Sequence, residues 1–583
     1  MGERAAALGR HAAERPTRTA PLRRLLPTLA SLALLAAVLW AARYALWRGF
    51  GLYEDDYTIV PTAAGMTLGE TLGFIGEYVA AMRGHARPLS DSFIYLLSNV
   101  GWRLGGLGAL YFIGFALTTL NAALFWGLLR RRYGAPVALI GGLAYVLFSA
   151  DTTQAYLTHS LGLQPSLTLL LLAFHLYGSR ARPLAYLLAA TILFAYETPY
   201  LLFLAAPLLE ARWNRSLLRR AAGHALIVLA LLGLAAALRM GVGEERVTGL
   251  VWREALRVSM EHTLAGPAVS LGSYGWRLVQ LAAAGSGQAW LASAAAWILF
   301  VPVLYAVFKG STGAGDESSD AKADGRRPYR SFMRLGVLGL VCLFLAYPLA
   351  FTTRATAISG RETRVHLAGV VGAPMVVAAL GAAWLGWAPV GAGTRRWLAS
   401  GALAVVFAGQ VGFGFLVQRD YTRSWELQGS FWTLLVGLVP DADEGTAIFV
   451  DPVGLEDTLQ IGANDWNLPI ILEQIYDLPA EWVAPPRVYR GTPEWREYLV
   501  LPDGSFRISG DTVMAPESVF GTVDRSNVIV LHSGGGVLTR RARPLVVDEV
   551  EYTLKPPGPE VLRSLPHGFL YDLLIRPESQ DPG

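Results

Sequence analysis

Apolar residues along this 583-residue chain gather into long runs, and polar segments separate one run from the next. A helix that crosses a bilayer needs about 20 consecutive apolar residues. Eleven runs reach or approach that length, which predicts eleven membrane-spanning segments. They lie at 26–47, 106–129, 134–150, 163–178, 183–196, 199–210, 222–240, 286–308, 335–353, 367–388 and 397–417.

The fifth and sixth of these runs, 183–196 and 199–210, are short. Pro199 stands between them, where it fits a break in the helix. The two runs are therefore either one bent helix or two tilted helices. If they form one span, every later segment changes its orientation.

The overall composition supports a membrane protein and excludes several other classes. Hydrophobic residues make up 53% of the chain and charged residues 16%, whereas soluble domains carry about a quarter charged residues. A soluble cytosolic enzyme, a disordered chain and a disulfide-rich secreted module are excluded. The single cysteine, Cys342, excludes an intrachain disulfide and a cysteine-based metal cluster. A net charge of +4, with basic residues scattered at loop ends, argues against a nucleic-acid partner.

The arginines predict how the chain is oriented. The tail at 1–25 is rich in arginine, so the positive-inside rule places it in the cytoplasm. Eleven spans then put the other strongly basic loops inside and the C-terminal segment outside. The first apolar run has a basic flank but no convincing small-x-small cleavage site, so we expect an uncleaved anchor. We expect a multi-pass protein of the plasma membrane with an extracytoplasmic C-terminus.

The polar segments divide the chain into units. A transmembrane domain at 26–417 contains an external loop at 48–104, and a Gly/Ser/Asp-rich cytoplasmic linker at 309–332. Residues 418–583 have short apolar runs punctuated by Pro and Gly, which predicts a small external α/β domain. In that region the sequence SGGG at 533–536 is interpreted as a turn between two strands.

The external loop also contains amphipathic stretches, around 67–82 and 89–103, that suit the membrane interface. A second external segment, 241–285, carries two tryptophans that are also interfacial candidates.

Three consecutive carboxylates follow the first span. Glu54, Asp55 and Asp56 stand between Tyr53 and Tyr57, directly beyond the membrane. Crowded carboxylates raise one another's pKa, and they can act as a general base or bind a divalent cation such as Mg²⁺ or Mn²⁺. We therefore take these three acidic residues as catalytic candidates, with Asp55 and Asp56 as possible metal ligands. The alternative is ordinary loop composition.

Other external loops supply groups that match this acidic motif. The loop between the ninth and tenth spans is basic although it is expected outside, and binding of an anionic lipid phosphate would explain that charge. Some of these residues have structural alternatives: Arg87 as an interfacial anchor, Glu197 in an internal ion pair or simply exposed at the interface, and pairing among Arg361, Glu362 and Arg364. The candidate substrate-binding residues are Arg87, His85, His159, Glu197, Arg354, Arg361 and Arg364.

These features together resemble the GT-C glycosyltransferases, polytopic membrane enzymes that take a sugar from a polyprenyl-phosphate carrier. Residues Glu54-Asp55-Asp56-Tyr57 stand where that superfamily has its acidic motif. The stretch Arg87-Pro88-Leu89-Ser90 and the pair Tyr196-Glu197 are similar to recurrent features of uncharacterised bacterial members. The resemblance covers about residues 20–420, and nothing ties 418–583 to a named domain.

The resemblance implies an inverting sugar transfer to a cell-envelope lipid, glycan or protein at the outer face of the membrane. Asp55 or Asp56 would remove a proton from the acceptor hydroxyl, and Arg361 and Arg364 would stabilise the leaving phosphate. The resemblance leaves a divalent cation undecided. The alternatives are an O-antigen ligase or polymerase, which does not need the early acidic motif, and a lipid-linked glycan transporter. A transporter is expected to bury charges in mid-span or to have two related halves, and the sequence shows neither.

Overall fold

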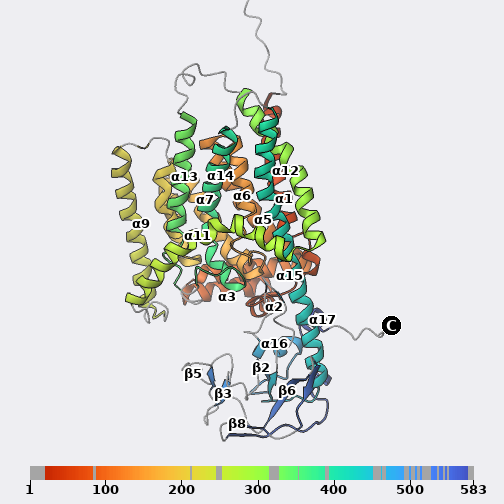
Figure 1. Cartoon of the computed structure of the whole chain (residues 1–583). Coiled ribbons are helices and arrows are strands. Elements are labelled where there is room, and N and C mark those ends of the chain that lie inside the picture. Colours follow the sequence, from red (N-terminus) through yellow and green to blue (C-terminus); the bar gives the residue numbers. More distant parts are fainter. Residues whose placement is uncertain are drawn as a thin grey trace, which may run out of the picture.

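The chain folds mainly into a bundle of helices, with a small set of strands at one end (Figure 1). The computed structural model describes residues 20–575 apart from several gaps. The gaps are 83–86, 210–212, 214, 245–251, 314–326, 352–353, 388–392, 451–457, 459–460, 462–467, 491–497, 501–505, 509–512, 515–526, 535–536, 543–544 and 548–549.

Six helical segments in the described residues are long and apolar enough to cross a membrane. This identifies the chain as a polytopic helical membrane protein. The six segments are Leu26–Gly49 (α1 Ala20–Arg43 with η1 Trp47–Gly49), α5 Pro88–Tyr133, His159–Tyr177 (η2 His159–Leu163 with α7 Gln164–Tyr177), α9 Arg215–Gly241, Gly287–Lys309 within α12 Gly287–Gly313, and α15 Gly393–Leu438.

A helix also stands at each of the other predicted spans, but these helices are shorter or less apolar. They are α6 Ala135–Val146, α8 Arg182–Ala195, η3 Tyr200–Leu209, α13 Arg327–Leu345 and α14 Gly369–Trp387. The count of eleven crossings therefore stays a prediction. The short pair is two helices rather than one, because the chain leaves helical geometry between Tyr196 and Pro199. The second is a ten-residue 3₁₀ helix, about 20 Å long, against a bilayer core of about 30 Å.

Both predicted amphipathic stretches are helical. α3 (Leu68–Ala80) begins with a capping box, in which Thr67 and Glu70 bond each other's backbone amides. The stretch at 89–103 is the first part of α5 and continues directly into a predicted span. The junction is a kink at Gly105 and Gly106, and Gly106 has φ 60°, a left-handed conformation that favours glycine.

The predicted external segment at 241–285 contains the helix α11 (Trp252–Ala284). In Figure 1, α11 lies across the bundle, near the end where α2 (Asp56–Gly65) and α3 are found. It contacts α13, α14 and α15. We call this end of the bundle, where α1 ends and α2 begins, the motif end.

α15 is longer than the sequence predicts. The predicted boundary between the last span and the C-terminal domain, at 417/418, falls inside this helix, which continues to Leu438. The stretch at 423–438, which lies in the predicted C-terminal domain, is the last part of this helix. A helix of 46 residues is about 69 Å long, so α15 extends from the bundle to the strands beyond it (Figure 1).

The main C-terminal sheet has the strand order β2-β1-β6-β7 (β1 Ala447–Val450, β2 Arg487–Arg490, β6 Val528–Gly534, β7 Val537–Arg540). β1 pairs in parallel with β2 and β6, and β6 pairs antiparallel with β7. Helix α16 (Leu468–Ile475) contacts β2. Gly534 pairs with Val537, so paired antiparallel strands flank residues 535–536 of the glycine-rich segment, which lie outside the described residues.

Smaller elements complete the described C-terminal residues. They are the sheet β3-β4-β5 (Tyr498–Val500, Phe506–Ile508, Val513–Met514), the hairpin β8-β9 (Leu545–Val547, Val550–Tyr552), η8 Leu562–Ser564 and α17 Tyr571–Leu574. A separate extracytoplasmic domain stays a prediction.

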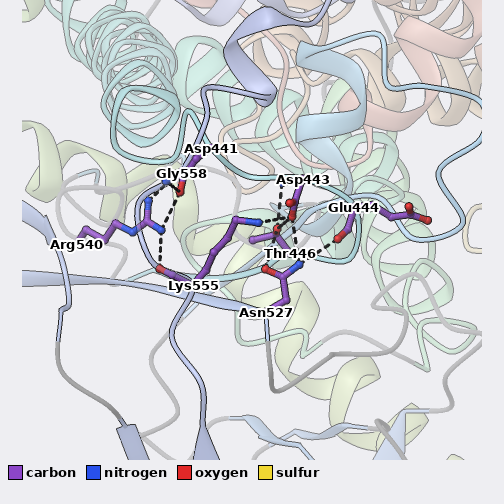
Figure 2. A network of polar contacts seen from close by, with 8 residues as sticks. All are labelled: Asp441, Asp443, Glu444, Thr446, Asn527, Arg540, Lys555 and Gly558. Carbon is purple, nitrogen blue, oxygen red and sulfur yellow. Dashed lines mark hydrogen bonds and ion pairs between the residues drawn. The ribbon is translucent and has the colours of Figure 1, made fainter.

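A polar network joins the end of α15 to this sheet (Figure 2). Asp441, 3% exposed in its side chain, accepts from Arg540 Nη1 at 2.6 Å and Nη2 at 3.1 Å, and from the Gly558 amide at 3.1 Å. Lys555 pairs with Asp443. The chain that leaves α15 is therefore tied to the β6–β7 hairpin. Phe569 also contacts the ring of Trp102 on α5, with ring centroids 4.6 Å apart.

The basic tail at 1–25 and the linker at 309–332, which is predicted to be cytoplasmic, fall largely outside the described residues. The structure begins at residue 20, and α12 and α13 are described on either side of 314–326.

Candidate active site

The acidic motif forms a tight turn at the start of α2. The Asp56 amide donates to the Tyr53 carbonyl at 3.0 Å, and Glu54 has φ 54°. α15 holds both sides of the turn. Tyr53 Oη donates to the Tyr421 carbonyl at 2.7 Å, and Tyr57 Oη donates to Gln428 Oε1 at 2.6 Å. The three carboxylates therefore occupy fixed and different positions.

Asp56 is fully buried, and its carboxylate accepts hydrogen bonds from backbone amides. Its carboxylate accepts from the amides of Tyr53 at 3.2 Å, Leu157 at 3.3 Å and Thr158 at 2.8 Å. Burial raises the pKa of Asp56 to about 7, even though these hydrogen bonds act to lower it. Asp56 thus fastens the turn to the loop at 147–158, which follows α6.

Glu54 and Asp55 share one arginine. Arg361 Nη1 lies 2.9 Å from Glu54 Oε2, and Arg361 Nη2 lies 2.9 Å from Asp55 Oδ2. Arg361 begins the 3₁₀ helix η6 (Arg361–His366), which precedes α14. Asp55 is the most open of the three carboxylates, with 34% of its side chain exposed against 16% for Glu54. The structure therefore brings the predicted basic loop against the acidic motif.

A second carboxylate lies in the loop after α6. Asp151 Oδ1 accepts from Thr153 N at 2.9 Å and from Thr153 Oγ1 at 2.8 Å. Thr153 Oγ1 lies 2.8 Å from His159 Nδ1. Burial raises the pKa of Asp151 to about 6. The Tyr156 ring connects this loop to the motif, because it stacks on Tyr53 and lies 5.2 Å from the His159 ring.

Two further arginines of the predicted set differ in their surroundings. Arg364 is half-buried, and its side chain makes no hydrogen bond or ion pair with the described residues. Its charge nevertheless acts on Asp151 and His159. The Arg354 side chain is exposed and has no such partner within the described part of the chain. The structure therefore places Arg364 beside the site and does not connect Arg354 to it.

Arg87 and Glu197 pair with each other rather than with the motif. Arg87 Nε donates to Glu197 Oε2 at 2.8 Å, Arg87 Nη2 bonds Oε1, and the guanidinium lies over the Tyr196 ring. Arg239 Nη2 reaches Glu197 Oε2 at 3.3 Å, and Arg239 Nε lies 3.8 Å from Glu244. Burial acts to raise the pKa of Glu197, but the two arginines hold it down to about 2. Glu197 thus forms an internal ion pair, which was one of the roles expected for it.

His85, also a candidate, lies outside the described residues. Conversely, the structure adds residues that the sequence did not single out. Asp91 on α5 bonds Tyr78 and lies within electrostatic reach of Arg87 and Asp55. In the sequence, Asp91 is a single acidic residue in the first turn of an amphipathic helix, so it could not be distinguished from ordinary charge at the membrane interface.

The residues present do not fit a divalent cation. Glu54 and Asp55 bind Arg361, and the Asp56 oxygens face backbone amides. The described residues contain no group of three or more His, Cys, Asp or Glu side chains that could hold a metal ion.

The fold and the site together define a polytopic membrane protein with a half-exposed carboxylate paired with an arginine at one end of its bundle. No family model matches the sequence, and no curated protein matches it. The crystal structure of ArnT from Cupriavidus metallidurans in the apo state is similar at a TM-score of 0.35 and 14% identity. The alignment covers 75% of this chain and 83% of that one. Likeness at this level establishes neither a shared fold nor a shared function.

Proposed function

We propose that the chain is an inverting glycosyltransferase that moves a sugar from a polyprenyl-phosphate carrier to a cell-envelope acceptor. The observation that carries this proposal is the placement of Asp55, half-exposed at the end of the first span and beside Arg361. A lipid phosphate presents its sugar at the same height in a membrane. The acceptor is a lipid, a glycan or a protein.

Asp55 is the general base in this proposal. It takes the proton of the acceptor hydroxyl, and that oxygen forms a bond to the anomeric carbon with inversion. The bond from the anomeric carbon to the phosphate oxygen breaks, and the polyprenyl phosphate leaves with the bonding electrons. Arg364 has no partner among the described side chains, so it supports the growing negative charge, with Arg361 as the second cation.

Asp56 is a positioning residue in this proposal. Its oxygens are occupied by three backbone amides, so they are not available to a substrate hydroxyl. Glu54 holds Arg361 next to Asp55. The adjacent aspartates, which the sequence could not rank, thus receive different roles.

The test begins with mass spectrometry of surface glycans and lipid-linked sugars in a deletion strain, which identifies donor and acceptor. The full chain in proteoliposomes is then given that pair, and release of polyprenyl phosphate is measured. Asp55→Asn should lower transfer by about 100- to 10,000-fold at normal protein levels, because the amide cannot take a proton. Glu77→Gln is the matched control, an exposed carboxylate on α3. Near-normal turnover of Asp55→Asn would refute the mechanism.

The same assay separates the alternative classes. A lipid-linked glycan transporter would move the carrier without breaking the bond between sugar and phosphate, so no polyprenyl phosphate would be released. A ligase or polymerase that does not use the acidic motif would keep its activity in Asp55→Asn.

A further inference from the structure

A chain of three polar groups ends beside the acidic motif and has no part in the mechanism above. Asp151, Thr153 and His159 are linked by hydrogen bonds of 2.8 Å, from Oδ1 to Oγ1 and from Oγ1 to Nδ1. His159 lies within electrostatic reach of Arg361 and Arg364. Its Nε2 makes no hydrogen bond with the described residues, and the residue keeps 6% of its surface exposed.

The direction of these hydrogen bonds follows from the donors available. An ionised carboxylate only accepts, and a threonine hydroxyl has a single proton to give. Since Asp151 accepts the Thr153 hydroxyl proton, the Thr153 oxygen must accept from His159. Nδ1 of His159 therefore carries the proton, and Nε2 is left with a lone pair. A second proton on the ring would place a third positive charge beside the two arginines.

We propose that His159 Nε2 accepts a hydrogen bond from a sugar hydroxyl of the substrate, with Thr153 and Asp151 as the positioning residues that fix its tautomer. This inference rests on the proposed function and deepens it. A lone pair suits a hydroxyl, which donates, and does not suit an ionised phosphate oxygen, which accepts. In one glycosyl phosphate, His159 would thus bind the sugar and the arginines would bind the phosphate.

The first experiment measures the tautomer without any substrate. The full chain, labelled with ¹⁵N-histidine in lipid nanodiscs at pH 8, gives signals from nine histidines, and the signal lost in His159→Gln assigns His159. We expect a protonated Nδ1 and an unprotonated Nε2. Thr153→Val should shift His159 toward the other tautomer, whereas Thr62→Val, whose hydroxyl bonds only its own helix, should not. A protonated Nε2 in the wild type would overturn the inference.

The second experiment measures transfer with the sugar identified in the deletion strain and with its monodeoxy analogues. His159→Phe removes the acceptor and should lower kcat/KM by about 10-fold, whereas His159→Gln, which keeps an oxygen acceptor, should lose less. One monodeoxy analogue should show the same loss with the wild type and no further loss with His159→Phe. If His159→Phe lowers kcat/KM equally for every analogue, His159 does not accept a hydrogen bond from a sugar hydroxyl. A wild-type chain that transfers no sugar would instead refute the proposed function.

Discussion

Single residues show how neighbours in sequence acquire different chemistry. The sequence placed three carboxylates beyond the first span, but it could not show that the third is buried. Burial of Asp56 depends on amides of Leu157 and Thr158, which lie 101 and 102 positions further along the chain. Likewise, Glu197 pairs with Arg87, directly before α5, and with Arg239 on α9. The position of the carboxylates directly after the first apolar helix thus followed from the sequence, whereas the partners supplied by distant segments did not.

Asp56 should make stability depend on pH. Its folded pKa of about 7 lies above the usual value of 3.8, so the folded chain binds more protons between those values. The free energy of unfolding should therefore fall as pH rises through that window, by at most about 1.4 kcal/mol per pH unit. Asp56→Asn should flatten the fall in Tm between pH 5 and pH 7 in detergent, and Asp151 should leave a smaller slope of the same sign. An unchanged slope in Asp56→Asn, matching that of Glu77→Gln, would contradict this.

Arg364 should bind the donor phosphate, which is already charged before the bond breaks, as well as support the charge that grows as it leaves. Loss of a hydrogen bond to a charged phosphate costs about 1.5–3 kcal/mol, so Arg364→Ala should raise the KM for the lipid-linked sugar by roughly 10- to 150-fold. Arg364→Lys should restore only part of the affinity for the lipid-linked sugar, because lysine lacks the two-pronged geometry of a guanidinium. Arg180→Ala, an exposed arginine in the loop before α8, serves as the control. An unchanged KM in Arg364→Ala would remove this residue from the site.

At the scale of whole elements, runs of apolar residues predicted where helices stand but not where they end. The predicted end at 417 is where charged residues begin, and the sequence from Arg419 to Leu438 contains no proline. A helix that leaves a bilayer meets water without losing its backbone hydrogen bonds, so hydropathy marks the change of solvent and not the helix end. This is why the predicted boundary at 417/418 falls inside α15. The motif depends on the part beyond the predicted end, which contains Tyr421 and Gln428.

Packing of α15 against the motif should not tolerate a larger residue at Gly51. A Cβ at this position would lie 1.8 Å from Cδ2 of Trp425 on α15, so the ring or the turn must move. We expect Gly51→Ala to cost about 1–3 kcal/mol and to lower Tm and transfer together. Gly65→Ala is the matched control, since nothing lies within 4 Å of its added methyl group. Equal Tm values for the two variants would show that α15 does not constrain the motif in this way.

At the scale of the whole molecule, the distribution of arginines predicts which end of the bundle faces out. The motif end and the C-terminal sheet should be extracytoplasmic. With Cys342 replaced by alanine, single cysteines at Gly76 on α3 and at the exposed Val483 should react with an impermeant thiol reagent in intact cells. A cysteine at Ser179, in the exposed loop between α7 and α8, should be protected until the cells are opened. If the cysteine at position 179 is the only one labelled in intact cells, the predicted orientation is wrong.

The long sequence separation between the motif and α15 also sets an order of events during synthesis. Tyr53 and Tyr57 are joined to partners 368 and 371 positions later. A ribosome adding about 5–20 residues per second needs about 20–75 s to cover that distance. Throughout that interval the first span has already been synthesised, but the part of α15 that holds the motif has not. A chain released between residues 418 and 427 therefore contains every predicted span but lacks Gln428, whose hydrogen bond with Tyr57 holds the motif, so the site is among the last parts of the protein to form.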